Sequence, residues 1–238
     1  MISFPIEKIV PLCEEFAPLD TKQQEQLNMY GNLLVEWNEK INLTAITEPQ
    51  EVVFKHFLDC LLFFKCSQVP QGAKIIDVGT GAGFPGLVLK IARPDIKLTL
   101  LDSLNKRITF LNEVIEKLGL EDVETIHARA EEGARKDALR ESFDIATARA
   151  VAPMNVLSEY CLPFVKKGGQ FIALKGPAAE NETLNAKKAI SLLGGEKPIV
   201  IKENIEEIGE RVIVRVKKIS QTSPKYPRNS AKISKQPL

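Results

Sequence analysis

The chain has 238 residues, 44% of them hydrophobic, which is enough for a full α/β core and a small additional unit. No apolar run approaches the length of a membrane span, and the first residues show neither region of a secretory signal, so we expect a cytoplasmic protein. The net charge of +1 excludes a chain that is strongly acidic or basic throughout, but it conceals a basic C-terminal end.

Residues 1–70 are predicted to form a helical extension. Apolar side chains between residues 27 and 37 recur with a 3.6-residue period, and Asp20 or Thr21 is the predicted cap of that helix. A second amphipathic helix is predicted over residues 51–64. His56 lies on its apolar face, which favours a buried core histidine over a contact with a binding partner.

A strand over residues 74–78 is followed by a loop in which glycines alternate with other residues: Gly79, Gly81 and Gly83. Glycine lets the backbone adopt conformations that are closed to other residues and lets a ligand lie directly against the main chain. Pro85 is predicted to start the helix that follows, because its fixed φ suits the first helical turn. Such a loop is typical of a nucleotide-cofactor site.

Two cofactor classes use this kind of loop, and the glycine pattern alone also satisfies the dinucleotide fingerprint. Asp77 separates them, since a carboxylate two residues before Gly79 would repel the pyrophosphate of NAD. S-adenosylmethionine has no pyrophosphate and carries an ammonium and a sulfonium group. The sequence therefore favours S-adenosylmethionine over a dinucleotide, and Phe84 is placed to pack on apolar parts of that cofactor.

Asp102 ends the next predicted strand, about 20 residues beyond the loop, where an acid is expected to accept hydrogen bonds from a cofactor ribose. The alternative role is to cap the helix predicted over residues 104–118, which Ser103 could also do. An acid at this point is expected with either cofactor. It supports a βαβ unit and leaves the identity of the ligand open.

Strands and helices alternate after residue 74, which predicts a parallel sheet covered on both faces, with further strands over 123–127, 144–148 and 169–174. Ligands bind at the carboxyl ends of such strands. The candidates that leave those ends are Arg129, Ala130, Glu131, Arg149 and Lys175, each of which could instead be a helix cap or a surface charge. Two late segments, 199–202 and 211–216, are predicted to form a terminal hairpin.

The C-terminal end is strongly basic, with eight basic residues and no acid between residues 211 and 238. Such a stretch suits the phosphates of a nucleic acid, although it could be an unstructured solvated tail. The apolar residues within it favour docking on the protein. We expect the tail to serve RNA binding and not the cofactor, through Lys225, Arg228, Lys232 and Lys235, with Arg129 as a further RNA contact.

The four cysteines and two histidines follow no metal-ligand spacing. We therefore expect no metal site and no disulfide framework.

The whole chain resembles the glucose-inhibited division protein B family of 16S ribosomal RNA guanine-N7 methyltransferases. The glycine loop is shared by many methyltransferases, whereas the two ends of the chain make the resemblance specific. Cys60 stands where serine is common in this family, which weakens a functional role for that position but not for its neighbours. The segments that carry the resemblance are Asn42-Leu43-Thr44, Lys55-His56-Phe57-Leu58-Asp59, residues 77–86, Arg129-Ala130-Glu131-Glu132, Arg149-Ala150-Val151-Ala152, Tyr226-Pro227-Arg228 and Lys235-Gln236-Pro237-Leu238.

The resemblance implies an α/β, Rossmann-like class I S-adenosylmethionine-dependent methyltransferase with a mostly parallel seven-stranded sheet and a terminal antiparallel hairpin. We divide the chain into the N-terminal helical extension (1–70), the methyltransferase domain (71–220) and a basic tail docked on that domain (221–238). The implied substrate is one guanine of 16S ribosomal RNA, free or in a precursor of the small subunit. Carried over by motif position, Gly79, Phe84, Ala130, Glu131 and Arg149 contact the cofactor.

Guanine N7 is an exposed acceptor without a proton, so its methylation needs positioning and no dedicated base. Arg149 and Lys175 are the predicted catalytic residues, as cations that orient the guanine. A methyltransferase for another acceptor, or a ribosome-associated factor that binds the cofactor without turnover, remain alternatives. The sequence indicates neither which guanine is chosen nor the oligomeric state.

Overall fold

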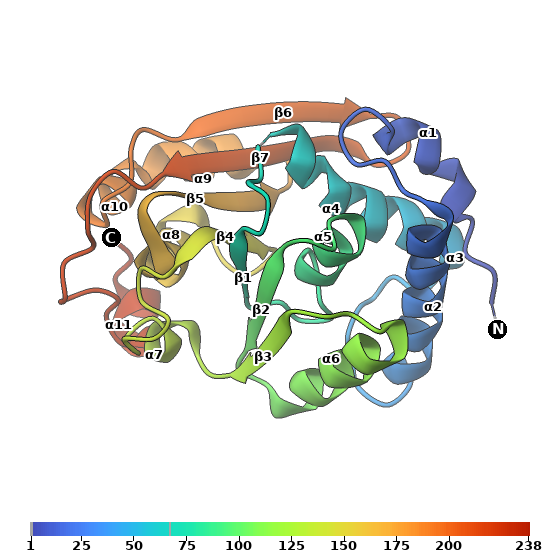
Figure 1. Cartoon of the computed structure of the whole chain (residues 1–238). Coiled ribbons are helices and arrows are strands. Elements are labelled where there is room, and N and C mark those ends of the chain that lie inside the picture. The colour runs from blue at the N-terminus through green and yellow to red at the C-terminus, as the bar shows by residue number, and fades with distance from the viewer. Residues whose placement is uncertain (1, 67) are drawn as a thin grey trace.

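A single sheet runs through the centre of the computed structural model, which describes residues 2–66 and 68–238 (Figure 1). Met1 and Ser67, both within the predicted 1–70 extension, lie outside the described residues. The strands are β1 (Lys74–Val78), β2 (Lys97–Asp102), β3 (Val123–His127), β4 (Phe143–Arg149), β5 (Val165–Lys175), β6 (Ile199–Ile205) and β7 (Gly209–Lys217).

The strand order is β3-β2-β1-β4-β5-β7-β6. Strands β1 to β5 pair in parallel, whereas β7 lies antiparallel between β5 and β6. The mostly parallel sheet of seven strands with a terminal hairpin is therefore confirmed for the described part of the chain.

Helices cover both faces of the sheet (Figure 1). The predicted helix over 104–118 is confirmed as α6, and the helix after the glycine loop begins at Gly86, with Pro85 as its cap and not its first residue. The helices are α1 (Val10–Cys13), α2 (Thr21–Asn38), α3 (Pro49–Val52), α4 (Asp59–Leu61), α5 (Gly86–Ala92), α6 (Asn105–Leu118), α7 (Ala130–Gly133), α8 (Met154–Cys161), α9 (Ala179–Asn185), α10 (Lys187–Leu192) and α11 (Ser230–Lys235).

The first long helix, α2, begins as its sequence predicts. Asp20 accepts a hydrogen bond from the Gln23 backbone, and the Gln23 side chain accepts one from the Asp20 backbone, a reciprocal capping box. The Gln23 amide also donates to the backbone carbonyls of Ile91 and Ala92 at the end of α5. The helical extension is thus hydrogen-bonded to the sheet domain as well as packed against it.

Buried side chains alternate between the two faces of the sheet along each strand, which produces two apolar layers. In β1, Ile75 and Ile76 are both fully buried but belong to separate hydrophobic clusters, because successive side chains of a strand point to opposite faces. The cluster of Ile75 includes residues of α2, α5, α6 and the helical segment from α3 to α4. The cluster of Ile76 includes residues of α8 and α10 and, from the C-terminal tail, Tyr226.

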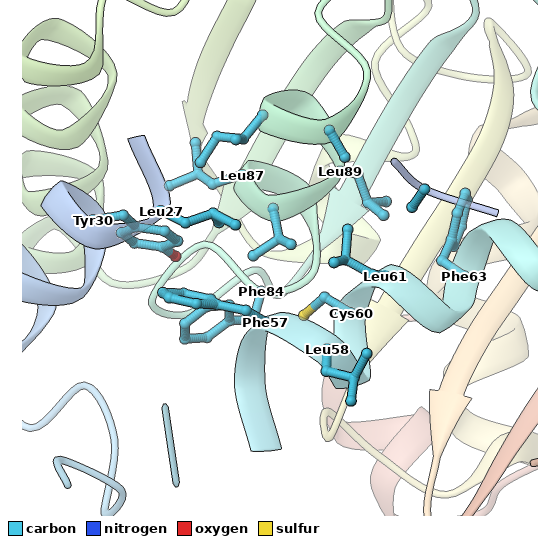
Figure 2. Packing of buried hydrophobic residues seen from close by; sticks show 14 of the residues in the cluster. Leu27, Tyr30, Phe57, Leu58, Cys60, Leu61, Phe63, Phe84, Leu87 and Leu89 are labelled. Carbon is cyan, nitrogen blue, oxygen red and sulfur yellow. The ribbon is translucent and has the colours of Figure 1, made fainter. Parts of the chain in front are cut away.

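Three aromatic rings join the extension to the glycine loop (Figure 2). The ring centroid of Tyr30 from α2 lies 5.6 Å from that of Phe57 and 5.4 Å from that of Phe84 in the loop. The Tyr30 hydroxyl donates to the backbone carbonyl of Ala82. The N-terminal helices therefore support the loop directly, while the boundaries drawn at residues 70 and 220 stay predictions.

The chain order of the strands reverses at β1, whose neighbours are β2 on one side and β4 on the other. At such a switch point the loops leaving the carboxyl ends diverge and open a crevice. Among the described helices, none is long and apolar enough to cross a membrane.

Candidate functional site

The glycine loop presents bare backbone at the switch point. Gly79 and Gly81 have φ values of +71° and +61°, a region that side-chain-bearing residues rarely adopt, and both line a cavity. A Cβ atom at Gly79 would lie 2.9 Å from Val151 Cγ2, whereas one at Gly81 would have no atom within 4 Å. A ligand can therefore approach the main chain at Gly81, as the sequence predicts.

Gly83, predicted to bind the cofactor, has a different role in the structure. A Cβ atom there would lie 2.4 Å from Leu87 Cδ1 and 2.7 Å from the Tyr30 hydroxyl, so this glycine is required for packing against α5 and α2. It does not line either of the two cavities described below.

Asp77 is fully buried and reaches neither cavity, contrary to the prediction that its carboxylate faces a cofactor. One carboxylate oxygen accepts hydrogen bonds from the Thr80 hydroxyl (2.6 Å) and the Gly86 backbone (2.8 Å). Burial raises the pKa of Asp77 to about 6, and these two hydrogen bonds oppose the rise. The geometry therefore assigns Asp77 to folding the loop onto the start of α5.

Asp102 also supports the loop. Its carboxylate is 2% exposed and accepts hydrogen bonds from the backbones of Gly81 and Leu104, both at 2.9 Å, and from Arg107 at 3.3 Å. These donors already surround the carboxylate, so its predicted contact with a ribose stays a prediction.

The larger cavity, about 570 Å³, opens beyond the carboxyl ends of β1, β4 and β5. Gly79 and Gly81 form one side of it, and the helical segment from α3 to α4 contributes another. Both predicted catalytic cations, Arg149 and Lys175, line it. Further lining side chains are Thr44, Lys55, His56, Asp59, Phe84, Arg107, Glu182 and Arg211.

Asp59 holds two arginines in this cavity. It accepts hydrogen bonds from Arg149 at 2.8 Å and from Arg211 at 2.7 Å, one on each carboxylate oxygen. The Arg149 guanidinium also stacks over Phe84, with 4.8 Å from its central carbon to the ring centroid. Because the positive groups are already oriented by a buried carboxylate, a ligand meets a preformed cationic surface.

His56 belongs to this cavity and not only to the core. A π-helical turn over Val53–Leu58 interrupts the helix here, and such turns frequently occur at functional sites. His56 Nδ1 lies 3.1 Å from a guanidinium nitrogen of Arg149, and Nε2 lies 2.9 Å from the Thr44 hydroxyl. Nδ1 also lies 3.1 Å from the backbone carbonyl oxygen of Lys55, so this ring nitrogen faces both a donor, Arg149, and an acceptor.

The ring of His56 stays neutral in the folded protein. Burial, reinforced by the positive charge of Arg149, lowers the pKa of His56 to about 3. A histidine with this pKa is uncharged near neutral pH and cannot exchange a proton in that range. Its position therefore serves to orient Arg149.

Lys175 is fixed by neighbours across the cavity. Its ammonium donates to the Ala152 carbonyl at 2.9 Å and pairs with Glu182 of α9 at 2.7 Å. The side chain is only 10% exposed, so Lys175 contributes a positive charge at a fixed point of the wall.

A smaller cavity, about 170 Å³, lies on the other side of Gly79. Ala130 and Glu131 line it, as predicted for residues that contact a cofactor, and so does the predicted RNA contact Arg129. The chain crosses from one cavity to the other after β4, since Arg149 and Ala150 line the larger one and Val151 the smaller one. Tyr160 of α8 and Ser230 of α11 complete the wall.

The tail residues predicted to bind RNA fall into two groups. Arg228 makes an ion pair with Glu159, whose side chain is fully buried, at 2.6 Å, and therefore stabilises the docked tail and is not free for phosphate. Lys225, Lys232 and Lys235 are exposed. Ser230 of the tail lines the smaller cavity together with Ala130 and Glu131, so the tail reaches the strand-end residues, and its expected role in RNA binding and not cofactor binding stays a prediction.

The sequence did not single out Thr44, Asp59, Arg107, Glu182, Arg211 or Ser230 as site residues. Thr44 and Asp59 lie in two of the segments that carry the family resemblance, which was the one signal for them. No group of three potential metal-ligating side chains occurs among the described residues, and all four cysteines are free and buried.

The sequence matches those of ribosomal RNA methyltransferases. A family model described as rRNA small subunit methyltransferase G matches residues 23–211. A Clostridium perfringens protein named Ribosomal RNA small subunit methyltransferase G is 54% identical over 216 residues, 90% of each chain. A protein of the same name from Clostridium botulinum is 54% identical over 222 residues, 92% of each chain.

Solved structures share the fold at low sequence identity. A precorrin-6y C5,15-methyltransferase from Geobacter metallireducens has a TM-score of 0.53 and 14% identity, over 75% of this chain and 91% of that chain. A 16S rRNA (adenine(1408)-N(1))-methyltransferase from Catenulisporales acidiphilia has a TM-score of 0.53 and 15% identity, over 67% and 88%. These neighbours support the class I methyltransferase fold.

Proposed function

Because the chain belongs to the rRNA small subunit methyltransferase G family, we propose that it transfers a methyl group from S-adenosylmethionine to N7 of one guanine in 16S ribosomal RNA. The observation that carries this proposal is the pair of cavities beside the glycine loop, one of which contains cations held in place by Asp59, His56 and Glu182. With ribosomal RNA as its substrate, the protein acts in the cytoplasm.

The proposed cofactor site is the smaller cavity, for the adenine end, together with the exposed backbone beside it. Gly79 lines both cavities, so a ligand that follows its main chain extends from one into the other. Ala130 and Glu131 are placed to bind the adenine end, and Gly81 to bind the end nearer the cations. Bound there, S-adenosylmethionine supplies an electrophilic methyl carbon.

The larger cavity is suited to the guanine. Guanine presents two acceptors side by side, O6 and N7, and arginine is a common partner of both. Arg149 is tied to Asp59 and His56, and Lys175 to Glu182, so each cation is held in place before a base arrives. Such preorganised charge orients the base without the cost of rearranging the site.

The reaction at N7 needs no general base. Guanine N7 has a free lone pair and no proton near neutral pH. His56 is neutral and already hydrogen-bonded through both ring nitrogens, so it has no part in proton transfer at that pH. Single-turnover rates at saturating cofactor and RNA should therefore vary little between about pH 6.5 and 8.5.

RNA phosphates are proposed to bind the exposed cations around the two cavities. Arg129 at the rim of the smaller cavity and Lys225, Lys232 and Lys235 on the tail are all solvent-exposed. Arg107 borders the larger cavity, and its guanidinium pairs with Asp102 at 3.3 Å.

The test uses the full-length protein, S-adenosylmethionine labelled in its methyl group, and 16S RNA, both free and assembled into small subunits from cells lacking the protein. The RNA is digested, and the labelled nucleoside is identified. Borohydride and aniline, which cleave RNA at 7-methylguanosine, then locate the site. We expect 7-methylguanosine at a single position.

Label in any other nucleoside would refute N7 as the acceptor. Cofactor binding without methyl transfer to either form of the RNA would instead favour a non-catalytic ribosome-associated factor. Transfer to a protein or small molecule but not to RNA would favour a methyltransferase for another acceptor.

A further inference from the structure

The C-terminal tail returns across the domain and ends beside the smaller cavity, where α11 lies close to α7 (Figure 1). Arg140 donates to the backbone carbonyls of Thr222, Ser223 and Tyr226, at 2.8, 3.3 and 2.9 Å. Arg135 donates to the carbonyl of Pro227 at 2.5 Å. The path of the tail is thus specified by side chains of the domain.

A buried ion pair fixes the tail just before α11. The Glu159 side chain, 0% exposed, accepts hydrogen bonds from the Arg228 backbone at 2.7 Å and from two nitrogens of its guanidinium. A carboxylate in this position is costly without its partner, so undocking the tail would leave an unpaired buried charge. The docked position is therefore favoured before any ligand binds.

Helix α11 presents different residues to the protein and to solvent. Asn229 caps it by accepting a hydrogen bond from the Lys232 backbone, and Ile233 is fully buried. Ser230 is half-buried and lines the smaller cavity, whereas the neighbouring Ala231 is exposed. The capped helix therefore holds the Ser230 side chain at the cavity.

We propose that the docked tail is the outer wall of the cofactor site, with Ser230 lying against the adenine end of bound S-adenosylmethionine. This inference rests on the proposed function, because it takes the smaller cavity as the adenine site. Apart from the tail, the cavity is bordered by residues that follow β1, β3 and β4, among them Gly79, Ala130 and Val151, and by Tyr160 of α8. The tail closes this surface, so cofactor affinity depends on tail docking.

The first experiment measures whether the cofactor covers position 230. Ser230→Cys and, as a matched control, Ala231→Cys are labelled with a maleimide, with and without saturating S-adenosylhomocysteine. The four native cysteines are buried, so their labelling is a slow background. We expect at least tenfold slower labelling at position 230 with the ligand and less than a twofold change at position 231.

The second experiment measures affinity by calorimetry. Ser230→Trp should weaken S-adenosylhomocysteine binding at least tenfold by filling the cavity, whereas Ala231→Trp should change it less than twofold. Arg228→Gln should weaken binding several-fold by loosening the tail. Melting temperature and circular dichroism establish that each variant is folded.

Equal labelling of the Ser230→Cys protein with and without ligand would overturn the proposal, as would unchanged affinity in Ser230→Trp. In that case wild-type protein would still methylate RNA, and the proposed function would stand. If wild-type protein bound no S-adenosylhomocysteine at all, the proposed function itself would fail.

Discussion

The two cavities beside Gly79 are lined by residues of different chemical character. The larger cavity is lined by charged side chains that pair with one another: Arg149 and Arg211 pair with Asp59, and Lys175 pairs with Glu182. The smaller one combines small residues such as Gly79 and Ala130 with Arg129, Glu131 and Tyr160, and Ser230 of the C-terminal tail also lines it. The turn from Arg149 to Val151 separates them.

Under the proposed function, the two cavities have different tasks. If the larger cavity binds the guanine, as proposed, its oriented charge acts on the group that reacts, and changes there should lower the rate of methyl transfer. The proposed cofactor stays bound throughout the reaction, and its affinity depends on the shape and closure of its site. Changes in the smaller cavity should therefore lower cofactor affinity. A substitution in the larger cavity is thus expected to change the rate and not the affinity, and one in the smaller cavity the affinity first.

The largest effect is expected from Arg149→Ala. Losing one preorganised donor at the reacting group costs about 10²- to 10³-fold in rate. Single-turnover methyl transfer should fall by that factor without acquiring a pH dependence. Arg149→Lys should not restore it, because an ammonium cannot reproduce the forked contacts to Asp59 and His56. Full activity in the lysine variant would show that only the charge matters.

His56 should make the larger cavity sensitive to acid. Its folded pKa of about 3 lies below the ordinary value near 6.5, so as the pH falls the unfolded chain takes up the proton first. The stabilisation is complete above about pH 6.5 and is lost by about 1.4 kcal/mol per pH unit as the pH falls toward 3.

The measurement is the free energy of unfolding of wild-type protein and His56→Gln from pH 7 to pH 4.5. The difference between the two proteins should shrink by roughly 3 kcal/mol over that range. His127→Gln, at an exposed histidine, controls for a general effect of losing a histidine. A difference that does not change with pH would show that His56 is not held neutral by the fold.

The tail lysines should affect RNA and leave the cofactor unaffected. Replacing Lys225, Lys232 and Lys235 together by glutamine should lower the salt dependence of RNA binding by about 0.7–0.9 per lost phosphate contact. Affinity for S-adenosylhomocysteine should stay within twofold, because all three side chains are exposed and none lines the smaller cavity. If the salt dependence of RNA affinity did not change, these three lysines would not contact RNA phosphates.

The smallest effect concerns the turn between the cavities. Ala150 has a φ of +56°, which is unfavourable for alanine and accessible to glycine. Ala150→Gly should therefore raise the free energy of unfolding by about 0.5–1 kcal/mol, with Ala152→Gly as a control expected to lower it. A lower free energy of unfolding in Ala150→Gly would mean that packing of the Ala150 methyl group stabilises the protein by more than the positive φ destabilises it.

Local sequence patterns correctly predicted the framework. The strands, α2 with its capping box and α6 follow from apolar periodicity and from side chains that bond to their own backbone, both of which act over a few residues. The strand-end rule placed Arg149, Lys175, Ala130 and Glu131 at the ligand edge of the sheet, where they line the two cavities, while their contacts with cofactor and guanine stay predictions. A residue at the end of a parallel strand reaches the ligand edge whatever the rest of the chain does.

The sequence by itself therefore determined the fold class, the glycine loop and the set of residues leaving the strand ends. Only the tertiary structure decided which groups meet there. Arg211 lies 152 residues from its partner Asp59, and nothing local to either residue specifies the pair. The burial of Asp77 and the return of Ser230 to the smaller cavity likewise depend on packing between distant segments. Side-chain pairing and burial are properties of the assembled core, whereas strand ends and helix caps are properties of short stretches of chain.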